Sequence, residues 1–114
     1  MKMTVVEDSG DFAHLALEGR LDSTTVGALE VKFFALFGPQ RHVAIIDLGG
    51  VSFIASMGIR ILVTAAKTLA ARKGRLVLFG PPALVRESLE AAGIDQAIPI
   101  ADDEAEARRL AFES

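Results

Sequence analysis

Two short apolar runs, separated by a helical pattern, constrain the fold more than any other feature of this chain. The runs are Val43–Leu48, interrupted only by Asp47, and Leu76–Phe79. Unbroken apolar runs of this length are typical of strands that are covered on both faces of a sheet. Between them, apolar residues recur at helical spacing: Ile59, Leu62, Val63, Ala66, Leu69 and Ala70. Strand, helix and strand within about 37 residues predict one βαβ unit with parallel strands.

The N-terminal part predicts a β-hairpin followed by a helix. Strands are expected over Thr4–Glu7 and Phe12–Glu18, with a turn between them. Apolar residues alternate in the second strand, which predicts one buried face and leaves His14 on the other. A cap is then expected among Asp22, Ser23 and Thr24, before a helix whose apolar face is Val26, Leu29, Phe33 and Leu36. Gly38-Pro39 is expected to end this helix.

The remaining elements follow from glycines, prolines and capping residues. Gly49-Gly50 is expected to break the central strand, so that a short loop leads to a helix starting near Ser56 and ending at Gly74. Pro81-Pro82 opens a further helix that Gly93 closes. A short edge strand is expected over Ala97–Ile100. Asp103 and Glu106 resemble a capping box for a last helix, which would dock through Leu110 and Phe112. We therefore predict one α/β domain over residues 1–114, with a mixed sheet of about five strands and helices packed against it.

Composition excludes several classes of protein. The net charge is −3 and no basic stripe is present, which argues against nucleic acid as a partner. The chain has no cysteine, and His14 and His42 share no ligand spacing, so we expect no metal, no cofactor and two histidines at the surface or at strand ends. No signal peptide and no apolar run of membrane-spanning length is found, which predicts a cytoplasmic protein.

Two enzyme classes were tested against the residues and rejected. A hydrolase elbow needs Gly-x-Ser-x-Gly directly after a strand, but Ile54 replaces the first glycine before Ser56. Both histidines also precede this serine, against the order that a hydrolase requires. Asp47 resembles the phosphoacceptor of response-regulator receivers, yet no lysine follows Lys73 and the opening hairpin is wrong for that fold. Asp47 is instead expected to accept loop amides before Gly49. We predict that the protein is not an enzyme.

One segment carries a specific resemblance. Ile46-Asp47-Leu48 leads through Val51-Ser52-Phe53-Ile54 and Ala55-Ser56-Met57 to Gly58-Ile59, which opens a helix. This pattern resembles the central motif of STAS domains, the sulphate transporter and anti-sigma antagonist family. Leu17–Asp22 resembles the family's Leu-x-Gly-x-Leu-Asp segment, and Leu76–Gly93 its later strand and helix. The resemblance covers essentially the whole chain.

The resemblance implies a mechanism called partner switching. An unphosphorylated anti-sigma factor antagonist binds an anti-sigma factor that is also a serine kinase, and thereby frees a sigma factor. The kinase phosphorylates a serine or threonine at the start of the central helix, which ends binding, and a serine phosphatase restores the active form. The resemblance also admits a STAS module in another assembly, such as a lipid-transport complex or a stress-signalling scaffold, where it would bind protein constitutively.

The resemblance assigns site residues with alternatives that the sequence leaves open. Met57 stands at the family's usual acceptor position and Ala55 where an acid often precedes, so Ser56 is the candidate phosphorylation site and Ser52 a poor second. Ser56 is alternatively a plain helix cap. Partner contacts are expected from a surface of Asp22, Ile54, Ala55, Met57, Gly58 and Arg60. Within it, Asp22 alternatively caps a helix, Arg60 either pairs with the phosphate or is an ordinary exposed residue, and Ile54 and Met57 are either exposed or partly core.

Overall fold

The fold is an α/β arrangement that follows the predicted order of elements. The computed structural model describes residues 2–36 and 42–112. The strands are β1 (Lys2–Ser9), β2 (Phe12–Leu21), β3 (Val43–Ile54), β4 (Arg75–Phe79) and β5 (Ile100–Ala101). The helices are α1 (Val26–Leu36), α2 (Ser56–Ala71), α3 (Ala83–Ala91) and α4 (Glu104–Phe112), with a 3₁₀ turn at Ile94–Gln96. The predicted stop of the first helix at Gly38-Pro39 lies outside the described residues.

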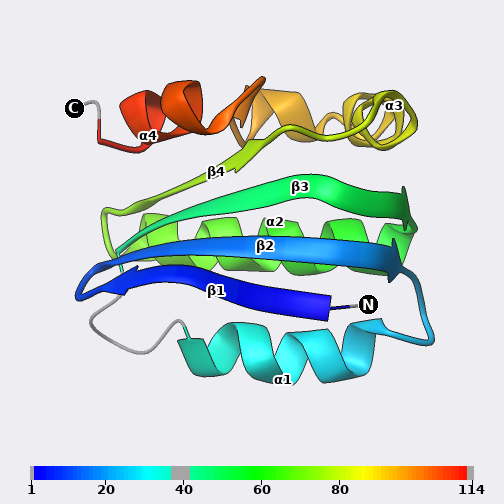
Figure 1. The fold of residues 1–114 in the computed structure, drawn as a ribbon, viewed down its shortest axis with the longest axis horizontal. Coiled ribbons are helices and arrows are strands. Elements are labelled where there is room, and N and C mark those ends of the chain that lie inside the picture. The colour runs from blue at the N-terminus through cyan, green and yellow to red at the C-terminus, as the bar shows by residue number, and fades with distance from the viewer. Residues whose placement is uncertain (1, 37–41, 113–114) are drawn as a thin grey trace.

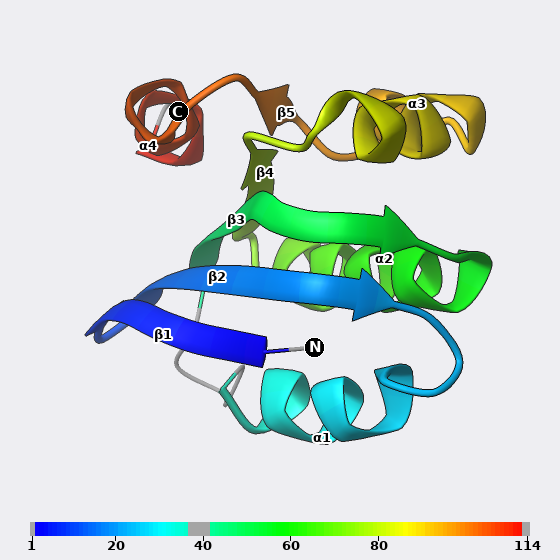
Figure 2. The ribbon, with the colours of Figure 1, turned by 45° about the vertical axis from the view of Figure 1, so that its right-hand side comes forward.

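The strands form one mixed sheet in the order β1-β2-β3-β4-β5. β1 and β2 pair as an antiparallel hairpin, whereas β2, β3, β4 and β5 pair in parallel. Figure 1 shows α2 behind β2 and β3, and α1 beside the hairpin, while α3 and α4 lie along the β4 side. The turned view in Figure 2 separates α3 from α4, with β5 between them. The hairpin, the βαβ unit and the mixed sheet were all predicted from the sequence.

Both faces of the central strands are buried, which explains their unbroken apolar runs. Ala44, Ile46 and Leu48 of β3 join the larger core, which α1, α2 and α3 cover. Ile45 points to the other face and joins a smaller cluster with Phe79, beneath Ala107 and Ala111 of α4. The apolar residues of the run thus enter a core on one side of the sheet or the other, as the two-residue period of a strand requires.

The prediction that Gly49-Gly50 breaks the central strand is wrong, because β3 continues to Ile54. A side chain at Gly50 would meet the Cγ of Glu18 at 2.7 Å, so the missing side chain lets β3 pass close to β2. The pairing with β2 shifts twice, once between Asp47 and Gly50 and once between Val51 and Phe53. At each shift β3 carries one residue more than β2, which is a β-bulge. The glycine pair therefore bends the strand without ending it.

The buried face of α2 differs from the predicted stripe. Gly58, Ile61, Leu62, Ala65 and Leu69 are buried. Ala70 is exposed, and Ile59, Val63 and Ala66 are only partly buried. The helix is therefore rotated slightly from the predicted stripe, because Ile61 and Ala65 face the sheet where the sequence pattern did not place them.

The C-terminal elements differ in detail from the prediction. The edge strand is Ile100–Ala101 rather than Ala97–Ile100, since Pro99 lacks an N–H and contributes only its carbonyl, which accepts from Leu78 N–H at 3.0 Å. The capping interaction before α4 is present: Asp103 Oδ1 accepts from Glu106 N–H at 2.9 Å. Glu106 in turn accepts from Asp102 N–H at 3.2 Å, one residue earlier than a standard capping box.

The docking of α4 agrees with the prediction in part, and a histidine is buried on the same face of the sheet. Leu110 packs against the smaller cluster as predicted, and Ala107 and Ala111 are buried in it. Phe112 is 60% exposed, with its ring 5.1 Å from that of Phe12. His14 was expected at the surface or at a strand end, but it is 3% exposed, on the face of β2 where Phe12 joins the smaller core cluster. Within the described residues, neither ring nitrogen of His14 has a hydrogen-bond partner. Its ring lies 5.6 Å from that of Phe79.

We expect His14→Leu to stabilise the fold. Replacing a buried imidazole without hydrogen bonds by an apolar side chain of similar size removes a desolvation cost, worth about 1 kcal/mol or more in unfolding free energy. Urea unfolding at pH 7 measures the change. The control is His42→Leu, at a half-buried position directly before β3, which we expect to give no such gain. A loss of stability in His14→Leu would contradict the burial of an unpartnered ring.

Candidate functional site

The carboxyl ends of β2 and β3 bring the predicted site residues together. Leu21 pairs with Ile54 in register, and Ala55 N–H donates to the Leu21 carbonyl at 2.8 Å. Asp22 therefore starts its turn beside the segment that opens α2. The structure thus gathers Asp22 and the segment Ile54–Gly58 at one corner, with Arg60 one turn further along α2.

Ser56 is exposed and is the first residue of α2, but it does not cap the helix. The cap position belongs to Ala55, in an extended conformation with φ −98° and ψ 172° and with no side-chain hydrogen bond to the first turn. The alternative that Ser56 is a helix cap is therefore wrong, because its backbone already belongs to the helix. Its hydroxyl makes no hydrogen bond with any described residue. An exposed hydroxyl at the positive end of a helix results.

Gly58 fixes how closely the start of α2 approaches β2. A Cβ added there would lie 2.9 Å from Leu21 Cβ and 3.1 Å from both Ile54 Cγ1 and the Leu21 carbonyl oxygen. Such distances leave no room for any side chain. The glycine is buried, so it shapes the corner from below rather than contributing to its outer surface.

The exposed apolar side chains at this corner are not the expected pair. Met57 is 45% exposed, as one alternative required, but Ile54 is 4% exposed and belongs to the core. Phe53 is the second exposed side chain, at 40%. The bulge between Val51 and Phe53 turns Ile54 inward and Phe53 outward. Sequence reasoning missed Phe53 because it treated this stretch as a loop, and alternation along an unbulged strand would not have found it either.

A small polar network supports the turn before α1. Asp22 Oδ1 accepts from the Thr24 hydroxyl at 2.6 Å and from Thr24 N–H at 3.0 Å, and Oδ2 accepts from Arg20 Nε at 3.1 Å. The Thr24 hydroxyl first, then the Arg20 side chain and the Thr24 amide, hold the pKa of the Asp22 carboxyl below its ordinary value of 3.8. Asp22 thus closes the turn before α1, which begins at Val26.

Arg20 connects this network to the exposed Phe53. Its guanidinium carbon lies 4.4 Å from the centre of the Phe53 ring, while Nε bonds Asp22. A cation over an aromatic face is attracted to it. Arg60, by contrast, is exposed and its side chain makes no ion pair with the described residues; its carbonyl accepts from the Thr64 hydroxyl at 2.9 Å. Arg20 therefore contacts the corner directly, although the sequence had not marked it.

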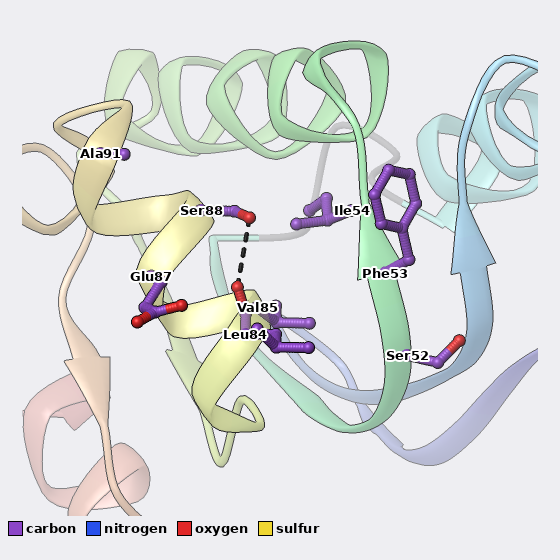
Figure 3. Close-up of a pocket in the computed structure, with 8 residues that line it drawn as sticks. All are labelled: Ser52, Phe53, Ile54, Leu84, Val85, Glu87, Ser88 and Ala91. Atoms are coloured by element: carbon purple, nitrogen blue, oxygen red, sulfur yellow. Dashed lines mark hydrogen bonds between the residues drawn. The ribbon is translucent and has the colours of Figure 1, made fainter.

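A groove opens beside this corner, between the end of β3 and α3. Its volume is about 460 Å³, and Phe53, Ile54, Leu84, Val85, Glu87 and Ser88 line most of it. Figure 3 shows Ile54, Leu84 and Val85 directed into the space between the strand and the helix. The Ser88 hydroxyl donates to the Leu84 carbonyl at 3.2 Å, inside α3. The groove is therefore mostly apolar, with one carboxylate.

Across residues 2–36 and 42–112, no three acidic or histidine side chains lie close enough to hold a metal ion. Among the described helices, none combines the length and the apolar character that crossing a bilayer needs. Asp47 behaves as predicted, because its Oδ1 accepts from Gly49 N–H at 2.8 Å.

The chain matches the STAS domain family model over residues 3–107. BtrV of Bordetella bronchiseptica, a candidate anti-sigma factor antagonist, is 31% identical over 114 residues, which cover 100% of this chain and 97% of BtrV. The chain belongs to the STAS family. The resemblance inferred from residues 46–60 is thereby confirmed for the chain as a whole.

Solved structures share the STAS fold. The unphosphorylated anti-sigma factor antagonist SpoIIAA superposes with a TM-score of 0.81 at 22% identity, covering 96% of this chain and 95% of SpoIIAA. The phosphorylated form of SpoIIAA, from Bacillus, gives 0.71 at 22% identity, over 96% of this chain and 99% of that one. An anti-sigma factor antagonist from Mycobacterium paratuberculosis gives 0.80 at 25% identity, over 98% and 96%. The fold is that of a regulatory binding domain rather than of a known enzyme family.

We expect Gly58→Ala to lower the unfolding free energy by about 1–3 kcal/mol, because the new methyl group overpacks against Leu21 and Ile54. Urea unfolding measures the loss. Gly27→Ala in α1 is the matched control: nothing lies within 4 Å of a Cβ there, and the helix should gain up to about 1 kcal/mol. Equal stability of Gly58→Ala and the natural chain would contradict the close approach.

Asp22 predicts a pH dependence with a defined sign. Because the folded protein lowers the pKa of this carboxyl, the stability it contributes is complete above the ordinary value of 3.8 and is lost as pH falls through the lower, folded value. Asp22→Asn should therefore be less stable than the natural chain at pH 7, with the difference shrinking below pH 3.8. The control is Asp95→Asn, which removes an exposed aspartate in the 3₁₀ turn and should leave the stability at pH 7 close to that of the natural chain.

Proposed function

We propose that this protein is an anti-sigma factor antagonist that acts in the cytoplasm and binds an anti-sigma factor of the serine-kinase type. Phosphorylation of Ser56 by that kinase ends the binding, and a serine phosphatase restores it. The observation that carries the proposal is the exposed Ser56 at the first turn of α2, flanked by the exposed apolar side chains of Met57 and Phe53. Membership of the STAS family and the similarity to BtrV support it.

The docking surface consists of Asp22, Phe53, Ala55, Ser56, Met57 and, one turn along, Arg60. Ile54 and Gly58 lie beneath it and fix its shape. Exposed apolar side chains that are rimmed by polar ones are a common feature of protein interaction sites. Met57 offers a flexible, polarizable contact that adapts to a partner, and Phe53 offers a rigid aromatic one held by Arg20.

A phosphate on Ser56 would change this surface without disturbing the fold. The first N–H groups of α2 have no partners within the helix, so they tolerate an anion. The phosphate adds roughly −1.5 to −2 charge at neutral pH. A partner docked over Met57 would then take this charge out of water, and its desolvation costs several kcal/mol even beside Arg60. Since about 1.4 kcal/mol is a tenfold change in affinity, one phosphate suffices to end a modest interaction.

The test begins with the anti-sigma factor of the same organism, recovered on the immobilised chain and identified by mass spectrometry. Calorimetry should show that Ser56→Ala binds it about as tightly as the natural chain, while Ser56→Asp binds at least roughly tenfold more weakly. Met57→Glu should lose affinity to a similar degree. Incubation with that kinase and ATP should place phosphate on the natural chain and on Ser52→Ala, but not on Ser56→Ala.

A matched control is Val31→Glu, which places the same charge on the exposed face of α1, away from the site. It should bind with natural affinity. Tight binding with phosphate on another residue, or on none, would refute the role of Ser56 while leaving the binding function intact. Failure of the natural chain to bind any anti-sigma factor would refute the proposed function.

A further inference from the structure

The groove between β3 and α3 has a preformed apolar floor. Ile54 and Val85 line it, and both belong to the main core, with 4% and 1% of their surfaces exposed. Their positions are therefore fixed by packing on the inner side of the sheet. A volume of about 460 Å³ is in the range of sites that enclose a ligand or several side chains.

The rim of the groove is unusually apolar for an exposed surface. Leu84 of α3 is 72% exposed, and Phe53 stands on the opposite side at the end of β3. Leu84 and Phe53 expose apolar surface to water at positions where the fold does not require an apolar residue. A partner that covers both side chains gains the free energy of removing this surface from water. The gain requires an occupant with apolar side chains.

The negative charge of Glu87 favours an occupant that carries a basic residue beside its apolar side chains. Glu87 is the groove's one ionisable lining residue, and it makes no ion pair within the part of the chain that the structure describes. The neighbouring cation Arg86 is engaged elsewhere, with Asp102 at 3.1 Å. A Lys or Arg beside the apolar side chains of an occupant would therefore find an unneutralised carboxylate at the rim.

The groove adjoins the docking surface around Ser56, because consecutive residues of the chain belong to both. Phe53 and Ile54 line the groove, and Ala55, Ser56 and Met57 follow directly on the outer surface of α2. A single docked protein would cover Leu84, Phe53 and Met57 together. A small apolar molecule in the groove, in contrast, would leave Met57 exposed.

We infer that the groove is a second part of the anti-sigma factor docking surface. It receives a segment of the anti-sigma factor whose apolar side chains lie between Phe53 and Leu84, with a Lys or Arg facing Glu87. This inference rests on the proposed function. The two parts of the surface then have different roles. The groove selects the partner through its shape and charge, and Ser56 controls whether that partner stays bound.

The test uses the full chain and the anti-sigma factor recovered in the capture experiment. Calorimetry should show that Leu84→Arg and Glu87→Lys each weaken binding roughly tenfold or more, as expected for central contacts of an interface. Glu90→Lys is the matched control, since Glu90 is exposed on the same helix but does not line the groove, and it should bind as the natural chain does. Thermal unfolding checks that every variant is folded, which the exposure of these side chains leads us to expect.

A charge exchange makes the test specific. Changing one Lys or Arg of the anti-sigma factor to Glu should restore the affinity lost in Glu87→Lys. A photo-crosslinker in place of Leu84 should join the two proteins at that segment, whereas one in place of Val31 should not.

Each remaining outcome has a defined meaning. Natural affinity in Leu84→Arg and Glu87→Lys, together with loss of binding in Met57→Glu, would overturn the groove inference and leave the proposed function standing. Sedimentation that shows a dimer dissolved by Leu84→Arg, with unchanged affinity for the anti-sigma factor, would assign the groove to a second copy and overturn the inference as well. Absence of any binding by the natural chain would remove both proposals.

Discussion

The burial of β3 and β4 on both faces is the constraint on which the rest of this structure depends. Strands that are apolar on both sides are shielded from water only if helices cover both faces of the sheet. α1 and α2 with part of α3 cover one face, and α4 covers the other. The buried ring of His14 lies on this second face, and its nitrogens have no hydrogen-bond partner among the described residues. At the margin of the face, Arg108 forms an ion pair with Glu7 at 2.8 Å. Hydrogen bonds to the Glu7 and Glu104 carboxylates raise the pKa of Arg108.

The functional corner is a consequence of how β3 leaves that buried sheet. Beyond Asp47, β3 has no partner in β4 and follows β2 alone. Two bulges along this stretch change which side chains point outward, and Gly58 then lets α2 begin directly against Leu21. The site is therefore rigid below and adaptable above: Ile54 and Gly58 are core residues, whereas Phe53, Ser56 and Met57 lie on the surface.

The proposed regulation uses this contrast. A hydroxyl at the first turn of a well-packed helix accepts a phosphate without rearrangement, so the modification changes the charge of the surface rather than its shape. The same rigid floor continues into the groove beside α3, where Glu87 and Leu84 offer a partner contacts that lie outside the serine's own turn. Affinity and its control would thus reside on adjoining parts of one surface.

The sequence by itself determined the order of the elements, the βαβ unit and the STAS motif, because these depend on local periodicity, on turn residues and on the spacing of residues 46–60. It also determined the roles of Asp47 and Asp103, because their carboxylate oxygens accept hydrogen bonds from backbone N–H groups only two or three residues away. Tertiary structure decided the rest. The passage of β3 beyond Gly49-Gly50 depends on the space that β2 leaves beside Gly50. The burial of His14 depends on residues far along the chain, such as Phe79, whose ring lies 5.6 Å from the imidazole. Ile54 turned inward and Phe53 outward because of a bulge, which is a mismatch between two strands and leaves no trace in either strand alone.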